Sequence, residues 1–249
     1  MIKGIYTAAS GMLVNQERLN NTANNLANAN TTGFKKDQTV QRSFRELMIS
    51  RIERNQRNVE IGRMGTGTVM EMSYTDYTQG NLRETGNKLD LALVGSGFFV
   101  VQTAEGIRYT RDGNFTLNER GQIVTQQGYP VLGERGEMQT ISGMAIDVGS
   151  DGQLYLGEIR GDRFQIVEIR EAQLMQKTGD NLYIADEALV ENAEGFEIRQ
   201  GFLEGSNVNI VQEMVEMIQL SRNYEATQKV ITTMDSTLDK AVNVVGRLG

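Results

Sequence analysis

A long hydrophobic repeat at residues 210–248 constrains the fold more than any other feature of the chain. Core-type positions recur there at alternating intervals of three and four residues, and all of them except Glu213 and Thr227 are apolar. No Gly or Pro interrupts residues 207–245, and a repeat held over more than five heptads is typical of a coiled coil. The predicted seam consists of Ile210, Glu213, Met217, Leu220, Tyr224, Thr227, Ile231, Met234, Leu238, Ala241, Val245 and Leu248.

A thinner stripe with the same spacing runs along residues 1–30, which we expect to form a second helix that stops at residues 31–33. Residues 15–30 contain seven asparagines. Each of them costs a helix about half a kcal/mol relative to Ala, so this helix should be marginal by itself. The stripe consists of Ile5, Ala9, Met12, Leu19, Ala23 and Leu26.

Asparagines define a second face of this predicted helix. Asn21, Asn25 and Asn28 lie on the side away from the apolar stripe. The face is compatible with two arrangements, namely amide hydrogen bonds to several packed neighbours or an ordinary polar surface exposed to water. Helices placed at both ends of a chain usually serve association, so the sequence indicates an assembly subunit.

The absence of two residue types excludes several kinds of active site. The chain contains no Cys and no His, and therefore no thiol nucleophile, imidazole base or Cys/His zinc site. Residues 95–97 (GSG) resemble part of a hydrolase motif, but Ser96 has no conventional base. We expect no enzymatic activity, no cofactor and no metal.

Charge and hydropathy exclude two further classes of partner. The net charge of −7 argues against nucleic acid. No apolar run approaches the roughly 18–20 residues that cross a bilayer, so no membrane insertion is expected. Residues 15–18 (NQER) interrupt the N-terminal segment before a signal-peptide core can form. We expect that any export does not follow the general secretory route.

Short apolar and β-branched runs between glycines dominate residues 66–199. Their spacing predicts an antiparallel meander or barrel-like domain of seven or more strands. Asp112-Gly113 and Asp151-Gly152 are predicted hairpin turns. The predicted strands are Leu89–Val94, Phe98–Gln102, Ile107–Thr110, Phe115–Leu117, Ile123–Thr125, Met144–Val148, Phe164–Ile169, Asn181–Ile184 and Phe196–Arg199.

The predicted fold class is α+β, with long N- and C-terminal helices that pair as a coiled coil and a central antiparallel all-β domain. We expect an N-terminal helix at residues 1–35, a connecting arm at 36–65, a central β domain at 66–203 and a C-terminal coiled-coil helix at 204–249. Within the arm, the spacing of apolar residues in Thr39–Arg57 is compatible with a helix.

Three blocks of sequence have an unusual composition and order. Residues 23–35 read ANNLANANTTGFK; residues 79–82, 90–99 and 109–115 read QGNL, DLALVGSGFF and YTRDGNF; and residues 204–209 read EGSNVN. These blocks resemble the N-terminal signature, the central β domain and the C-terminal segment of the flagellar basal-body rod and hook family. Residues 129–133 lean toward its proximal-rod type, whereas residues 65–67 and 79–82 fit the distal-rod type equally well.

The resemblance implies a structural subunit of the rod, which polymerises helically into the shaft that carries torque from motor to hook. It implies a location in the basal body, outside the cytoplasmic membrane. The partners that it implies are further copies of the chain, other rod proteins, hook or hook-side axial proteins, the flagellar type III export apparatus, and surrounding ring or bushing proteins. The alternative is a non-enzymatic coiled-coil adaptor or hook-junction protein that forms a discrete oligomer.

Candidate polymerisation residues follow from the two stripes and the signature. Those of the N-terminal helix are Ile5, Met12, Leu19, Asn24, Asn25, Leu26 and Asn28, followed by a family turn at Gly33 and Phe34. Those of the C-terminal helix are Ile210, Met217, Leu220, Tyr224, Ile231, Met234, Leu238 and Val245.

Overall fold

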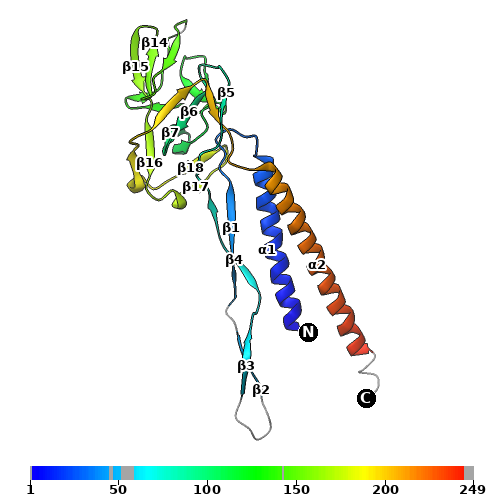
Figure 1. The fold of residues 1–249 in the computed structure, drawn as a ribbon. Coiled ribbons are helices and arrows are strands. Elements are labelled where there is room, and N and C mark those ends of the chain that lie inside the picture. Colours follow the sequence, from blue (N-terminus) through cyan, green and yellow to red (C-terminus); the bar gives the residue numbers. More distant parts are fainter. Residues whose placement is uncertain (1, 45–46, 52–58, 142, 244–249) are drawn as a thin grey trace. The chain divides into compact units, whose positions relative to one another are not determined.

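The computed structural model describes residues 2–44, 47–51, 59–141 and 143–243 (Figure 1). The chain forms two compact units. Unit 1 contains residues 1–27, 37–74 and 209–249, and unit 2 contains residues 28–36 and 75–208. The chain therefore passes between the units four times, after Ala27, Lys36, Tyr74 and Val208.

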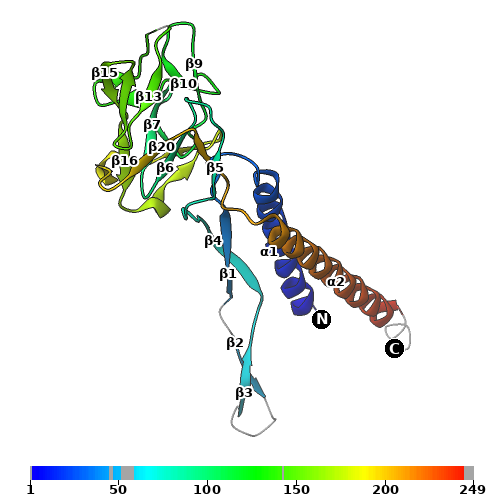
Figure 2. The same cartoon turned by 45° about the horizontal axis from the view of Figure 1, so that its top comes forward.

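Two long helices dominate unit 1, α1 (Ile2–Ala27) and α2 (Ile210–Asn243), and they confirm the predicted N- and C-terminal helices. They lie side by side and run antiparallel (Figures 1 and 2). A Cβ on Gly4 would lie 2.9 Å from Met234 Cε, whereas Arg18 of α1 pairs with Glu216 near the start of α2.

The first helix ends at Ala27, three residues earlier than the predicted end at residue 30. The backbone carbonyl of Asn28 accepts a hydrogen bond from Thr31 N, and its side-chain oxygen accepts one from the Thr31 hydroxyl. Asparagine and threonine side chains often compete with helical hydrogen bonds in this way. The turn at residues 28–31 therefore replaces the last predicted turn of helix.

The hydrophobic repeat marks the inner face of α2. Among the described residues of this helix, the side chains that are at least partly buried are Glu216 and the positions of the predicted seam. Glu213 and Leu220 are the most buried of them. The seam positions Val245 and Leu248 lie outside the described residues.

Two-stranded ribbons complete unit 1. One pairs β1 (Asp37–Ser43) with β4 (Thr68–Thr75), and the other pairs β2 (Leu47–Arg51) with β3 (Val59–Met64). The helical interpretation of residues 39–57 is therefore wrong wherever the structure describes them. Residues 45–46 and 52–58 lie outside the described part.

Pairing between distant segments explains why residues 37–43 are extended. The Tyr74 hydroxyl donates a hydrogen bond to Gln38 Oε1 at 2.6 Å, and Arg42 forms an ion pair with Glu71 at 3.0 Å. Strand formation depends on such cross-strand contacts more than on local preference. The apolar spacing within residues 39–57 does not contain this information.

Unit 2 confirms the predicted antiparallel β domain. Its described residues include a six-stranded sheet in the order β17-β18-β8-β7-β16-β19, in which all neighbours are antiparallel. Its strands are β7 (Phe98–Thr103), β8 (Gly106–Thr110), β16 (Ile166–Ile169), β17 (Gln176–Lys177), β18 (Leu182–Ile184) and β19 (Val190–Asn192).

Smaller antiparallel sheets and two short 3-10 helices accompany this sheet. The pairs are β5 (Leu82–Glu84) with β21 (Phe202–Glu204), β6 (Leu91–Val94) with β20 (Glu197–Gln200), β9 (Phe115–Leu117) with β10 (Ile123–Thr125), and β11 (Leu132–Gly133) with β12 (Gly136–Glu137). A three-stranded sheet contains β13 (Ile146–Val148), β14 (Gln153–Leu156) and β15 (Ile159–Arg163). The 3-10 helices are η1 (Ala172–Leu174) and η2 (Glu187–Leu189).

The two predicted hairpin turns have different outcomes. Asp151-Gly152 lies between the paired strands β13 and β14, and Gly152 has φ +83°, so this turn is confirmed. Asp112-Gly113 joins β8 to β9, which are not paired with each other, so this hairpin is wrong. A Cβ on Gly113 would lie 1.6 Å from Leu91 O, so glycine is needed here because it lets the two backbone segments come close together.

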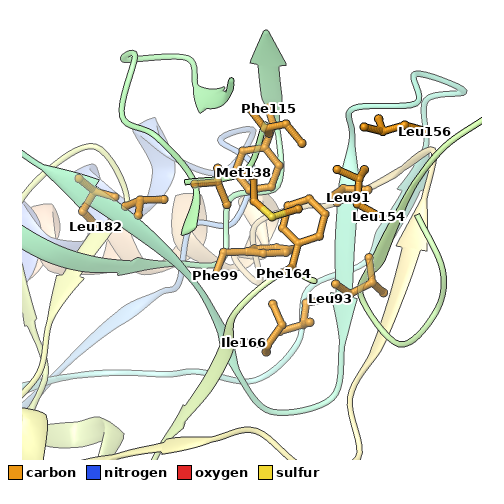
Figure 3. Packing of buried hydrophobic residues seen from close by; sticks show 14 residues of the cluster. Leu91, Leu93, Phe99, Phe115, Met138, Leu154, Leu156, Phe164, Ile166 and Leu182 are labelled. Carbon is orange, nitrogen blue, oxygen red and sulfur yellow. The ribbon is translucent and has the colours of Figure 1, made fainter. Parts of the chain in front are cut away.

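Both faces of β7 are buried. Phe99 points into the main core, where it meets Phe115 edge-to-face at 5.1 Å and lies near Phe164 (Figure 3). Phe98 points into a second cluster that contains Tyr183. Because neighbouring side chains of a strand point to opposite faces, one short apolar run supplies both cores of unit 2.

The close approach at Gly113 generates a stability prediction. We expect Gly113→Ala to lower the free energy of unfolding of unit 2 by about 3 kcal/mol, because the added methyl group overlaps backbone. Thermal denaturation monitored by circular dichroism should show Tm lowered by roughly 6–12 °C. Gly161→Ala is the control, since its Cβ would come no nearer than 3.3 Å to another atom. Equal melting temperatures for the two variants would contradict the prediction.

Candidate assembly surface and junction cluster

The α2 seam is only partly covered within the subunit. Leu220 is buried, whereas Val245 lies outside the described residues. The other predicted residues are partly exposed, namely Ile210, Met217, Tyr224, Ile231, Met234 and Leu238. A single neighbouring helix cannot enclose an apolar stripe on both of its flanks, and the seam therefore retains apolar surface for further contacts.

On α1 the most buried side chains differ from the predicted stripe. They are Val14, Thr22 and Asn25, of which only Asn25 was predicted. Asn24 is exposed, and the remaining predicted residues are partly exposed: Ile5, Met12, Leu19, Leu26 and, in unit 2, Asn28. Positions 14, 22 and 25 do share one helical face, but two of these residues are polar, so a search for apolar periodicity does not find them.

Polar contacts fix how α1 packs. The Asn25 side chain donates to Asp37 O at 2.8 Å and lies 3.4 Å from Glu213 Oε2, while its own oxygen accepts from Asp37 N at 3.0 Å. Asn25 therefore uses its amide for hydrogen bonds, which is one of the two arrangements compatible with the sequence. Arg18 adds a partly exposed ion pair to Glu216 at 2.8 Å. A buried polar side chain with satisfied partners favours one register over its neighbours.

A second apolar stripe lies on the exposed side of α2. Val211, Val215 and Ile218 occupy one helical face at intervals of four and three residues, and each is at least half exposed. On α1, Tyr6 and Leu13 are exposed on one face of the helix, two turns apart. The spacing of residues 211, 215 and 218 is visible in the sequence, but this stripe was not predicted because the longer apolar repeat of the seam dominates the same segment.

Unit 2 contains a buried group of charged side chains. Lys35 Nζ lies 2.6 Å from Glu204 Oε1, and both side chains are almost completely buried. Arg111 lies 3.6 Å from Glu204 Oε2, and its guanidinium stacks over the Phe98 ring at 5.1 Å. We refer to Lys35, Arg111 and Glu204, together with Asn207, as the junction cluster.

Burial opposes the charges of this cluster. It lowers the pKa of Lys35, and the neighbouring Glu204 carboxylate works in the opposite direction. It also lowers the pKa of Arg111, again against the attraction of Glu204. A buried charge is tolerable only when it is paired and hydrogen-bonded, so Glu204 is the group that permits both cations to be buried.

Backbone groups add hydrogen bonds to the two central charges, Glu204 and Lys35. Glu204 Oε1 also accepts a hydrogen bond from Gly80 N at 2.9 Å, and Lys35 Nζ donates to Thr78 O at 2.8 Å. A Cβ on Gly80 would lie 2.0 Å from Gly205 O, so only glycine permits this approach. The pair therefore joins three chain segments that are far apart in sequence.

The side chain of Asn207 binds the segments that connect the units. Its oxygen accepts from Lys36 N at 2.7 Å, and its amide donates to Asp76 O at 2.8 Å. Asp76 N in turn donates to Lys36 O at 2.8 Å. Three of the four passages between the units, after Lys36, after Tyr74 and after Val208, thus begin within two residues of one hydrogen-bond network.

The predicted family turn lies inside unit 2. Gly33 has φ +66°, its N–H donates to Glu204 O at 2.8 Å, and a Cβ would lie 2.5 Å from Asp112 N. Phe34 is buried beneath Lys177, whose Nζ lies 4.6 Å from the ring centroid. The structure thus gives the turn a packing role, and its part in polymerisation stays a prediction.

The three resembling blocks each supply one charge of the junction cluster. Lys35 ends the first block, Arg111 lies in the second and Glu204 begins the third. The sequence offered a weak signal here, since Lys35 and Glu204 are the only charged residues of the first and third blocks. Their pairing was not predicted, because nothing local shows that positions 35 and 204 meet.

The described residues offer neither a membrane span in a helix nor a cluster of metal ligands. Neither α1 nor α2, as far as they are described, is long and apolar enough to cross a membrane. The described His, Cys, Asp and Glu side chains include no group of three or more that could hold a metal ion.

Comparison with known proteins identifies relatives over the full length. The model of the flagella basal body rod protein family matches residues 5–35, that of the flagellar hook protein FlgE/F/G D1 domain matches residues 92–156, and that of the flagellar basal body rod FlgEFG protein C-terminal region matches residues 199–244.

Individual relatives agree with these matches. Flagellar basal-body rod protein FlgF of Caulobacter vibrioides is 37% identical over 100% of this chain and 99% of its own length. Flagellar hook-basal body complex protein FlhO of Bacillus subtilis is 33% identical over 100% of both chains, and flagellar basal-body rod protein FlgG of the same organism is 33% identical over 98% of this chain and 99% of its own. The chain therefore belongs to the family of flagellar basal-body rod proteins.

Proposed function

We propose that the chain is a structural subunit of the flagellar basal-body rod, where it polymerises into the shaft that carries torque from motor to hook. The observation that carries this proposal is how little of α1 and α2 is buried. Among the side chains of these two helices whose exposure the structure describes, only Val14 and Leu220 are buried and apolar, whereas unit 2 contains two buried clusters. Unit 1 needs neighbours to bury its helices.

The free energy of helix formation supports assembly as the way in which α1 and α2 bury their apolar faces. Ordering a residue costs about 1–2 kcal/mol of backbone entropy, and a helix gains most of its stability from packing of its apolar face. The partly exposed seam of α2 and the exposed stripe at 211–215–218 offer two separate faces. A polymer that does not close requires different surfaces on opposite sides of each subunit, which two such faces provide.

Within this polymer we propose that α1 and α2 pair as a coiled coil and take part in the contacts between copies. The heptad spacing of α2 and its antiparallel packing against α1 support this arrangement. The polymerisation roles of the predicted seam residues belong to the same proposal. We also propose that the chain divides into four folding segments, namely the N-terminal helix (1–35), the arm (36–65), the β domain (66–203) and the C-terminal helix (204–249).

The proposed partners follow from a place in the axial structure. They are further copies of the chain, other rod proteins and hook-side axial proteins, with the flagellar type III apparatus for export and ring or bushing proteins as surroundings. The family is a structural one, and we propose that the chain has no enzymatic activity.

The exposed stripe of α2 provides a test of polymerisation. Ile218→Asp should leave the fold of the subunit intact, because the side chain is 54% exposed. A charge forced into a desolvated contact costs several kcal/mol, so assembly should weaken by about 100-fold or more. The measurement is motility and rod assembly in a flagellated bacterium whose own gene for this subunit is deleted.

Ile159→Asp is the matched control, since Ile159 is 50% exposed but lies in unit 2. This variant should restore motility as the unaltered chain does. Full motility of the Ile218→Asp strain would contradict an assembly role for the exposed stripe.

Sedimentation of purified protein separates the proposed polymer from a discrete adaptor. The full-length chain should associate in a manner that depends on concentration, because open-ended contacts add subunits one by one. A chain that ends at residue 209 should remain monomeric and retain the β-sheet circular dichroism of unit 2. A stable dimer or trimer whose size is independent of concentration would favour the coiled-coil adaptor instead.

A further inference from the structure

The junction cluster lies in unit 2 and contains residues close in sequence to points where the chain passes into unit 1. Lys35 precedes the passage to β1 by one residue, and Glu204 and Asn207 precede the passage to α2. The Lys35–Glu204 contact joins positions 169 residues apart. All of its contacts lie inside unit 2, which has its own core.

We propose that the junction cluster is a clasp that positions the chain segments leading to α1, the ribbon and α2, so that load applied to one segment is shared by the others. This goes beyond the proposed function, because the clasp acts within one subunit and can be measured without assembly. Its members are positioning residues. They hold the ends of the chain segments that lead into the ribbon and α2.

The chemistry of the cluster favours a clasp over simple core packing. A buried ion pair adds little stability relative to apolar residues of equal size, but removal of one partner leaves an uncompensated charge. Glu204 binds Lys35 and Gly80 N with the same oxygen, and Lys35 also binds Thr78 O. No one of these segments can leave without breaking contacts of the other two. The arrangement is therefore cooperative.

The hydrogen bonds around Asn207 extend the clasp to the passages themselves. Lys36, Asp76 and Thr78 all contact its side chain. Gly205 N donates to Asn81 O at 2.9 Å, and Gly33 N donates to Glu204 O at 2.8 Å. These backbone amides report directly on whether the clasp is closed.

Amide hydrogen exchange on the full-length chain tests the proposal. Lys35→Met should open the clasp and accelerate exchange at Gly33, Lys36 and Gly205 by about 100-fold relative to amides of β7 and β16, because the segments then open separately from the core. The matched control is Leu154→Ala, a fully buried core position of β14. Both variants should lower Tm by about 10 °C.

The comparison with the control distinguishes positioning from general destabilisation. In Leu154→Ala the junction amides and the core amides should accelerate together. If Lys35→Met gives that same uniform pattern, the junction is only part of the core and the proposal is wrong. Asn207→Ala provides a milder variant, since Asn207 is partly exposed. It should accelerate exchange at Lys36 and Asp76 while Tm falls by no more than about 3 °C.

A double-mutant cycle tests the coupling of the charges. Glu204→Gln and Lys35→Met should each lower Tm by about 10 °C, since each leaves a buried charge without its partner. The double variant should lose less than the sum of the two, because both single changes remove the same Lys35–Glu204 contact and the double variant loses it only once. Arg111 lacks its carboxylate partner both in Glu204→Gln and in the double variant, so this loss does not alter the comparison. Additive losses would show that the two residues act independently and would overturn the clasp. Motility does not enter either test, so failure of the rod function would leave these outcomes unchanged.

Discussion

The ion pair between Lys35 and Glu204 is the contact around which the junction cluster is built. The two side chains are almost completely buried, and a buried charge is costly unless it is paired. Their contact brings the turn after α1, the strand β5 region and the end of β21 to one place. The rest of the junction follows from it, including the close approach of Gly80 to residue 205.

In unit 1 the limiting factor is apolar burial, because the helices are long and their apolar stripes are narrow. One helix covers only part of the other, which leaves the α2 seam partly exposed and adds a second stripe outside it. The polar contact of Asn25 with Asp37 fixes packing without adding apolar burial. A unit of this kind is specific in its register but incomplete in its core.

Periodicity predicted much of this structure, since it reports burial along a single element. The seam from Ile210 to Ala241 matches the inner face of α2, and β9 and β10 have the predicted bounds. What it could not predict are contacts between distant segments. The ribbon of residues 37–43 and 68–75 depends on cross-strand pairing. Asp112-Gly113 does not form a hairpin turn, because Gly113 instead allows the close approach to the backbone of Leu91. The junction cluster was missed for the same reason.

The two units therefore divide the work of folding and assembly. Unit 2 has its own core and can order the turn at Gly33 and the segment at Glu204 before any neighbour is present. In the proposed polymer, ordering these anchors in advance would reduce the conformational entropy that α1 and α2 lose on burial. A helix that starts from a fixed point has fewer alternatives to search than one on a free tail. On this proposal, an ion pair inside unit 2 lowers the entropic cost of assembling the helices of unit 1.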